Sequence, residues 1–340
     1  MDPIRLAIIG AGIFAHDAHL PSLLNLQGTF QIAAVYSRTA ASAQALATAV
    51  AELASTKSAE KATTADVAVY TDLASLLHTP EIDAVDVVLP IPVMTPVVAQ
   101  ALESGKHVFS EKPIAPDVAT AQQLMTHLQQ PGQQWMVGEN WRYESAYVQA
   151  AQLVRDGAIG EVKTCHVAFH LPMAEGSKYF GTTWRRSDEF FGGMLMDGGV
   201  HHAALLRMVI GEVASVTAQM ANTSAHFAMP ETLSATLAFA NGVLGSYFVS
   251  YGWGSPWGGE LHVTGTSGAL RVQRGKIELV QQGETRQIPC AKFDGVEQEF
   301  AGFAAAIQQG VPHRNTAEAA LQDVAVVEAM IRSAQTGKQQ

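Results

Sequence analysis

The start of the chain constrains the fold most strongly. Residues 4–9 form an apolar run that leads directly into the sequence G-A-G-I-F-A at residues 10–15. This pattern predicts a strand, a tight glycine turn and the start of a helix that binds a dinucleotide. Gly10 permits the turn, Gly12 lets backbone approach a pyrophosphate, and Ala15 lets the helix pack on the strand. The residues expected to contact the cofactor here are Gly10, Gly12, Ile13 and Phe14.

Composition narrows the class of protein. The chain has 340 residues, 48% hydrophobic and 15% charged, which is typical of a globular enzyme with two domains. A formal net charge of -10 argues against a nucleic acid or an anionic membrane as partner. Cys165 and Cys290 have no metal-binding spacing, so we expect reduced thiols in a cytoplasmic protein and no metal site. No signal peptide is recognised, and no apolar run approaches the roughly 20 residues that span a bilayer.

Strand and helix patterns alternate over residues 1–138, which predicts a dinucleotide-binding Rossmann domain with a doubly wound parallel sheet. Strands are expected at 30–36, 67–70, 84–89, 107–110 and 135–137, and helices at 39–53, 95–104 and 117–130, with a helix through Leu77 capped by Thr71 and a polar connection at 55–65.

Residues 139–340 are expected to form a substrate-binding and oligomerisation domain of the α+β class, with a largely antiparallel open sheet. Asn241-Gly242 is a strong hairpin signal. Strands are expected at 162–170, 213–220, 233–239, 243–251, 261–264, 269–273 and 276–280, and helices at 146–156, 298–308 and 316–334. Helices on one face would leave the other face partly apolar, which predicts a homodimer or homotetramer through this sheet.

The second strand ends at Tyr36-Ser37-Arg38. NAD-preferring sites commonly carry an acidic residue here for the ribose 2′-hydroxyl, whereas Arg binds a 2′-phosphate. Ser37 and Arg38 therefore favour NADP(H) over NAD(H), although an ordinary solvated arginine is the alternative.

Two further motifs carry chemistry. Glu111-Lys112-Pro113 follows a parallel strand, at the edge where open α/β sheets bind ligands, so Glu111 and Lys112 are expected at the cofactor and Lys112 beside a substrate oxygen. Asp197 and His201 lie four residues apart at the start of a helix that runs to about residue 210. This spacing brings a carboxylate beside an imidazole, which it can orient. A capping Asp with an ordinary surface His is the alternative.

Other polar and aromatic side chains are expected near the site. Asn140 and Trp141 follow the last strand of the first domain and are predicted to lie near the nicotinamide. Residues predicted to contact substrate, in addition to Lys112, Asp197 and His201, are Arg142, Tyr179, Trp184 and Arg185. For Trp184, packing in the core is an equal alternative.

These motifs, in this order, resemble the Gfo/Idh/MocA family, the glucose–fructose oxidoreductase and inositol dehydrogenase group. The resemblance covers essentially the whole chain and is nearest to an NADP-dependent subgroup that carries Glu-Asn-Trp at residue 139 and Thr-Thr-Trp-Arg at residue 182. It implies that Lys112 touches the nicotinamide ribose and the substrate, that His201 is the acid/base and that Asp197 is its partner. Leu89-Pro90 falls where the family carries Thr-Pro beside the cofactor, while Met94 and Ala204 replace polar residues that other members use.

The sequence thus predicts an NADP-dependent oxidoreductase that interconverts alcohol and carbonyl on a sugar-like or polyol substrate. A histidine exchanges the proton, and a lysine ammonium stabilises developing alkoxide charge. Two alternatives remain open. One is a non-catalytic, dinucleotide-binding regulator of the same fold, and the other is a reductase of a non-sugar carbonyl.

Overall fold

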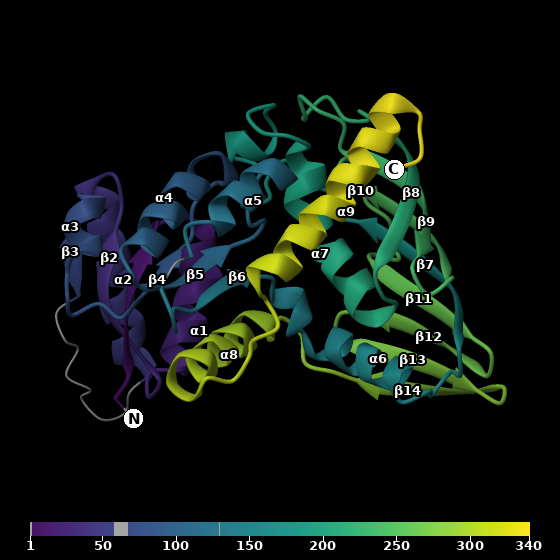
Figure 1. Ribbon diagram of the computed structural model, residues 1–340, viewed down its shortest axis with the longest axis horizontal. Coiled ribbons are helices and arrows are strands. Elements are labelled where there is room, and N and C mark those ends of the chain that lie inside the picture. Colours follow the sequence, from purple (N-terminus) through teal and green to yellow (C-terminus); the bar gives the residue numbers. More distant parts are fainter. Residues whose placement is uncertain (1, 58–66, 129) are drawn as a thin grey trace. The chain divides into compact units, whose positions relative to one another are not determined.

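The computed structural model describes residues 2–57, 67–128 and 130–340 (Figure 1). The chain divides into two compact units. The first comprises residues 1–115, 119–138 and 296–319, and the second comprises residues 116–118, 139–295 and 320–340. The first unit therefore takes up a segment from the far end of the chain.

The described strands of the first unit form a six-stranded sheet in the order β3-β2-β1-β4-β5-β6, and every pair in it is parallel. The sheet reverses its strand order between β1 and β4, which is where doubly wound sheets bind dinucleotides. The strands are β1 (Ile4–Ile9), β2 (Phe30–Tyr36), β3 (Ala68–Tyr70), β4 (Ala84–Val87), β5 (His107–Glu111) and β6 (Trp135–Gly138).

Helices connect these strands or pack beside them. A π-helical turn, Ala15–His19, follows the glycine turn and continues into α1 (Leu20–Asn25). The others are α2 (Ala40–Lys57), α3 (Leu73–Leu77), α4 (Ile91–Glu103), α5 (Val118–Met125) and α8 (Gly295–Gln309). Helix α8 lies beside α1 in Figure 1, where Asn25 donates to Glu297 Oε2 at 2.6 Å.

The strands of the second unit form an eight-stranded sheet in the order β14-β13-β12-β11-β7-β10-β9-β8. β7 and β10 pair in parallel, and the other pairs are antiparallel. The predicted fold class is confirmed in both units. The strands are β7 (Val162–His170), β8 (Val213–Ala221), β9 (Thr232–Phe239), β10 (Leu244–Ser250), β11 (Glu260–Gly265), β12 (Gly268–Gln273), β13 (Lys276–Gln281) and β14 (Glu284–Pro289).

Helices cover one face of this sheet, as Figure 1 shows for α6 (Ser145–Arg155) and α7 (Gly193–Val209). The side chains of Cys165, Val167 and Phe169 on β7 alternate into that covered face and are buried. His166, between them, is exposed on the other face. The long helix α9 (Ala317–Thr336) contributes its residues from Ala320 onward to this unit.

The predicted ends of three helices differ from those in the structure. The cap of α3 is Asp72 rather than Thr71, because the Asp72 carboxylate accepts from the Ser75 N–H at 2.8 Å. Helix α4 begins four residues earlier than predicted, since proline is tolerated in a first helical turn. Residues 55–57 continue α2, and most of the connection predicted at 55–65 lies outside the described residues.

Candidate active site

The glycine turn lies at the carboxyl end of β1. Gly10 has a φ of 118°, and a Cβ there would lie 2.2 Å from the Val88 carbonyl oxygen, so only glycine fits. A Cβ at Gly12 would meet no atom within 4 Å, so the space beside the turn is open. A dinucleotide pyrophosphate fits this arrangement, with tight packing on one side of the turn and room on the other.

The other cofactor residues predicted for the first unit follow neighbouring strands. The Gly10 N–H donates to the Tyr36 carbonyl at 3.0 Å, which ties the glycine turn to the end of β2. Ser37 and the exposed Arg38 come next in the chain. Leu89 follows β4, and its Cδ2 would lie 3.1 Å from a Cβ at Gly10. The structure therefore brings these predicted residues to one edge of the sheet.

Lys112 follows β5 at the same carboxyl edge and is partly exposed. Its peptide bond to Pro113 is cis. The preceding residue, Glu111, is 8% exposed and points inward, where its carboxylate meets His19. Pro90 follows Leu89 and precedes α4, while Ile13 and Phe14 form the entry to the π-helical turn.

His201 lies on α7 in the second unit and is partly exposed. Its Nδ1 lies 2.6 Å from Glu139 Oε1, and the Trp141 indole stacks on the imidazole with centroids 5.2 Å apart and an interplanar angle of 12°. The Glu139 side chain is almost fully buried, and Oε1 also accepts the Trp141 N–H at 3.2 Å. A carboxylate on Nδ1 fixes the ring orientation and leaves Nε2 to exchange a proton.

The sequence prediction missed Glu139 as the carboxylate on Nδ1. It assigned Asp197 as the partner of His201, and Asp197 Oδ2 forms an ion pair with Arg185 Nε at 3.0 Å. A signal for Glu139 was available, because this acid directly follows the apolar strand β6. The carboxyl end of a parallel strand is the position that also singled out Lys112.

Four residues predicted to contact substrate come together in the second unit. The Arg185 guanidinium lies over the rings of Tyr179 and Trp184, with its carbon 4.9 Å and 4.2 Å from their centroids. It also binds Asp197, one helical turn before His201. The two aromatic rings and the ion pair hold this arginine in place.

Arg142 has a different environment. It is 7% exposed, and its Nη2 donates to both carboxylate oxygens of Asp323, at 2.7 and 2.6 Å. Arg207 binds the same carboxylate at 2.6 Å. Burial raises the pKa of Asp323 to about 6, although both arginines act in the opposite direction. Arg142 thus takes part in an internal ion network, which argues against the predicted contact with substrate.

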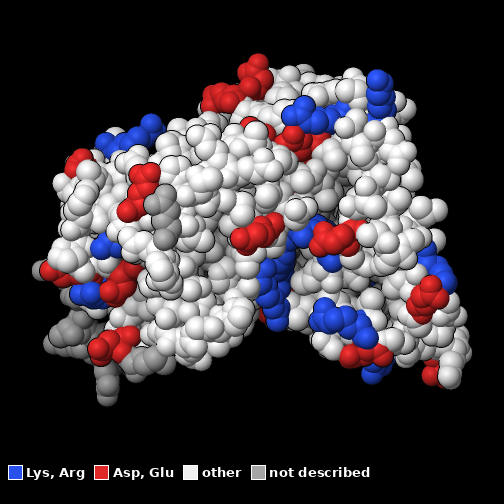
Figure 2. All heavy atoms as spheres, in the orientation of Figure 1, with Lys and Arg blue, Asp and Glu red and all other residues white. Residues whose placement is uncertain are grey.

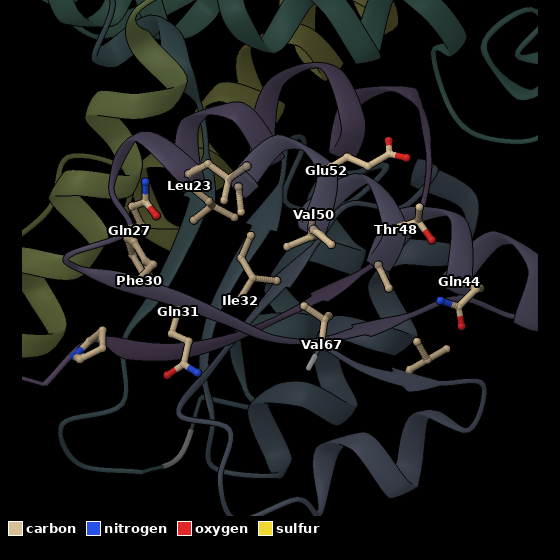
Figure 3. Close-up of a pocket in the computed structure, with 16 residues that line it drawn as sticks. Leu23, Gln27, Phe30, Gln31, Ile32, Gln44, Thr48, Val50, Glu52 and Val67 are labelled. Atoms are coloured by element: carbon tan, nitrogen blue, oxygen red, sulfur yellow. The ribbon is translucent and has the colours of Figure 1, made fainter. Parts of the chain in front are cut away.

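A pocket of about 800 Å³ lies elsewhere in the first unit, between α1, α2 and β2 (Figure 3). Its lining includes Pro3, Phe30 and Gln31, which lie at the amino ends of β1 and β2, opposite the glycine turn. Among the described residues that line it, Glu52 is the one with an acidic or basic side chain. The described lining of this pocket therefore contains neither a histidine nor a lysine, and the pocket lies away from the glycine turn.

Charges on the face that Figure 2 shows are mixed, with Lys and Arg interspersed among Asp and Glu. Within the described ranges, no cluster of His, Cys, Asp and Glu could hold a metal ion. Among the helices of the described chain, none has the length and hydropathy needed to cross a membrane.

A parallel Rossmann sheet with an open glycine turn at its carboxyl edge defines a dinucleotide-binding protein. The chain belongs to the Gfo/Idh/MocA family: residues 4–139 match the NAD-binding Rossmann fold of this oxidoreductase family, and residues 151–340 match its C-terminal alpha/beta domain. It is thus an NAD(P)-dependent dehydrogenase or reductase of a family that often acts on sugars.

Some relatives match over nearly the full chain. Dehydrogenase FPY6 of Fusarium mangiferae is 29% identical, and the match covers 97% of this chain and 96% of that protein. The crystal structure of oxidoreductase TM0312 from Thermotoga maritima is 33% identical with a TM-score of 0.88, covering 99% and 98% of the two chains. A levoglucosan dehydrogenase in complex with NADH and levoglucosan shares the fold, with 17% identity, a TM-score of 0.84 and 99% of each chain covered.

Proposed function

We propose that the protein uses NADP(H) to interconvert an alcohol and a carbonyl group on a sugar-like or polyol substrate. The observation that carries this proposal is the contact between His201 Nδ1 and Glu139, which leaves Nε2 of a partly exposed imidazole to exchange a proton. The levoglucosan bound by the similar structure supports a sugar-like substrate.

The cofactor, when bound, supplies or accepts the hydride. The backbone around Gly10 and Gly12 holds its pyrophosphate, and Leu89, Pro90, Asn140 and Trp141 contribute contacts in this proposal. Arg38 follows β2 and is exposed, so its guanidinium is available to a ribose 2′-phosphate. Arg38 is the basis for preferring NADP(H) over NAD(H).

The proton is handled by His201 and Lys112. When a carbonyl is reduced, the imidazolium donates from Nε2 to the substrate oxygen, and Glu139 stabilises the charged ring before transfer. The Lys112 ammonium neutralises the alkoxide charge that develops on that oxygen. Asp197 and Arg185, held between Tyr179 and Trp184, bind substrate hydroxyl groups in this proposal.

The exposed face of the eight-stranded sheet supports the proposal of a homodimer or homotetramer. Leu244 and Phe248 on β10 and Ala168 on β7 alternate onto the face opposite the buried Val167 and Tyr247. Light scattering of the purified protein measures the number of subunits directly.

Turnover of a sugar and polyol panel with NADPH or NADP⁺ tests the activity. We expect Lys112→Ala and His201→Ala each to lower kcat by about 100-fold or more, while the Kd of NADPH changes little. NADPH binding without turnover of any sugar, polyol or other carbonyl compound would instead support a non-catalytic regulator.

A further inference from the structure

A fully buried histidine lies inside the first unit, below the carboxyl edge of the sheet. His19 Nδ1 lies 2.9 Å from Asp86 Oδ2, and Nε2 lies 2.9 Å from Glu111 Oε1. His19 and Asp86 are fully buried, and Glu111 is 8% exposed. The imidazole therefore bridges two carboxylates from neighbouring strands, β4 and β5.

The surroundings of His19 are apolar apart from these acids. The rings of Phe14, Phe109 and Phe300 meet the imidazole edge to face, with centroids 5.1 to 5.7 Å away. Gly138, opposite Glu111 on β6, leaves room for this cluster, since a Cβ there would lie 2.8 Å from Phe109 and 3.2 Å from Glu111 Oε1. Solvent cannot replace either carboxylate as a partner of the ring.

A charged imidazole can donate to both carboxylates at once. Burial lowers the pKa of His19, but Asp86 and Glu111 outweigh this effect and raise it to about 10. With both ring nitrogens protonated, each donates to a carboxylate in a charge-assisted hydrogen bond. Glu111 is thereby anchored directly before Lys112.

The position of His19 along the chain matters as much as its charge. It ends the π-helical turn Ala15–His19, which begins directly after the glycine turn. Such π-helical turns are rare in proteins, and those that occur often lie at functional sites. One side chain thus connects the pyrophosphate-binding turn to β4 and to the end of β5.

We propose that His19 is a positioning residue, which holds Glu111 and thereby fixes the direction of Lys112 relative to the glycine turn. The inference rests on the proposed function in one respect: that Lys112 stabilises the charge on the substrate oxygen. Stability alone is a weak reason for such a cluster, because apolar side chains of similar volume often replace buried ion networks without loss. Orientation is a stronger reason, since a misplacement of about 1 Å can cost roughly 100-fold in rate.

Two amide substitutions separate orientation from charge. The amide nitrogen of asparagine is as many bonds from Cβ as Nδ1, so His19→Asn keeps a donor toward Asp86 and loses the donor toward Glu111. The longer glutamine reaches the position of Nε2, so His19→Gln keeps a donor toward Glu111. Both variants remove the same positive charge, and their unfolding free energies are measured beside the functional readouts.

The first readout needs no turnover: the rate at which acetyl N-hydroxysuccinimide modifies Lys112, measured by peptide mass spectrometry. We expect His19→Asn to change this rate at least threefold and to lower kcat about 10- to 100-fold. In His19→Gln both values stay closer to those of the unmodified protein. The Kd of NADPH is expected to change less than threefold in either variant.

The inference would be overturned if both variants changed the modification rate of Lys112 only in proportion to their loss of unfolding free energy, with no larger effect in His19→Asn. If the His19 variants do not fold, Glu111→Gln and Asp86→Asn make the same comparison from the acids: only Glu111→Gln should change the modification rate of Lys112. A protein that turns over no substrate refutes the proposed function, while the modification rates still decide the role of His19.

Discussion

Glu139 Oε1 lies 2.6 Å from His201 Nδ1 and also accepts the backbone N–H of Trp141. One carboxylate therefore orients the imidazole and caps the short 3₁₀ turn at residues 140–142, which carries the indole that stacks on that imidazole. The ring is fixed from its edge and from one face. Its orientation thus depends on residues 139–141 as well as on its own helix.

Replacing this carboxylate should impair proton transfer. We expect Glu139→Gln to lower kcat about 100-fold with a small change in KM, because a neutral amide no longer stabilises the imidazolium or enforces the tautomer. Steady-state kinetics with NADPH measures the effect. Glu260→Gln is a matched control, since it breaks another Glu–His contact, to His262 at 2.8 Å. A similar loss in both variants would contradict the assigned role of Glu139.

The two glycines of the turn should respond differently to a side chain. Gly12→Val places its atoms in open space, so we expect the Kd of NADPH to rise at least tenfold while the unfolding free energy changes by less than about 1 kcal/mol. Gly10→Ala meets the Val88 carbonyl at a φ of 118°, so we expect about 2–4 kcal/mol of destabilisation. Fluorescence titration and urea denaturation measure the two quantities. Unchanged NADPH binding by Gly12→Val would place the pyrophosphate elsewhere.

The cofactor preference should depend on one guanidinium. We expect Arg38→Ala to reduce the ratio of kcat/KM for NADPH to that for NADH at least tenfold, because a 2′-phosphate loses its ionic partner. Arg286→Ala, which removes an exposed arginine from β14, should leave the ratio unchanged. A preference for NADH in the unmodified protein would refute the proposed NADP specificity.

The His19 cluster should make stability depend on pH in a known direction. The folded pKa of about 10 lies above the unfolded value near 6.5, so the stabilisation is complete below pH 6.5 and is lost as the pH rises toward 10. We therefore expect the difference in unfolding free energy between the unmodified protein and His19→Gln to be larger at pH 6 than at pH 9. Urea denaturation at both pH values measures it. A difference that is constant, or larger at pH 9, would contradict a raised pKa for His19.

We expect Arg142 to contribute to stability and Arg185 to contribute to substrate binding. Arg142→Met leaves the buried carboxylate of Asp323 with one arginine fewer, so we expect about 3–5 kcal/mol of destabilisation and an unchanged KM. Arg185→Met removes a more exposed ion pair and should raise the KM of whichever panel substrate is turned over. Denaturation and kinetics on both variants test this, and the reverse pattern would return Arg142 to the substrate site.

Local sequence patterns were sufficient for most of the fold, because apolar strands, helix signals and glycine turns act over a few residues. They also placed Lys112 and Arg38, since the ends of parallel strands meet at one edge of a sheet. β14 was missed because it is an exposed edge strand, and the polar sequence of residues 284–289 carries no alternation that burial would impose.

Partners far apart in sequence could not be predicted in the same way. Glu139 and His201 are 62 residues apart, and Arg142 and Asp323 are 181 residues apart. Helical spacing favoured Asp197 as the partner of His201, whereas tertiary packing gave His201 Nδ1 a different carboxylate. A contact between side chains of two distant elements produces no periodic pattern in the sequence.

The late segment of the first unit has a consequence for synthesis. Phe300 and Phe303 of α8 are fully buried and pack against Phe109 of β5, and the Asn315 carbonyl accepts the Val137 N–H of β6 at 3.0 Å. When only residues 1–138 have emerged from the ribosome, the aromatic face of the Rossmann sheet is therefore still uncovered. This unit can close its core only after the second unit has been translated almost completely, so a nascent chain must protect that face from aggregation in the meantime.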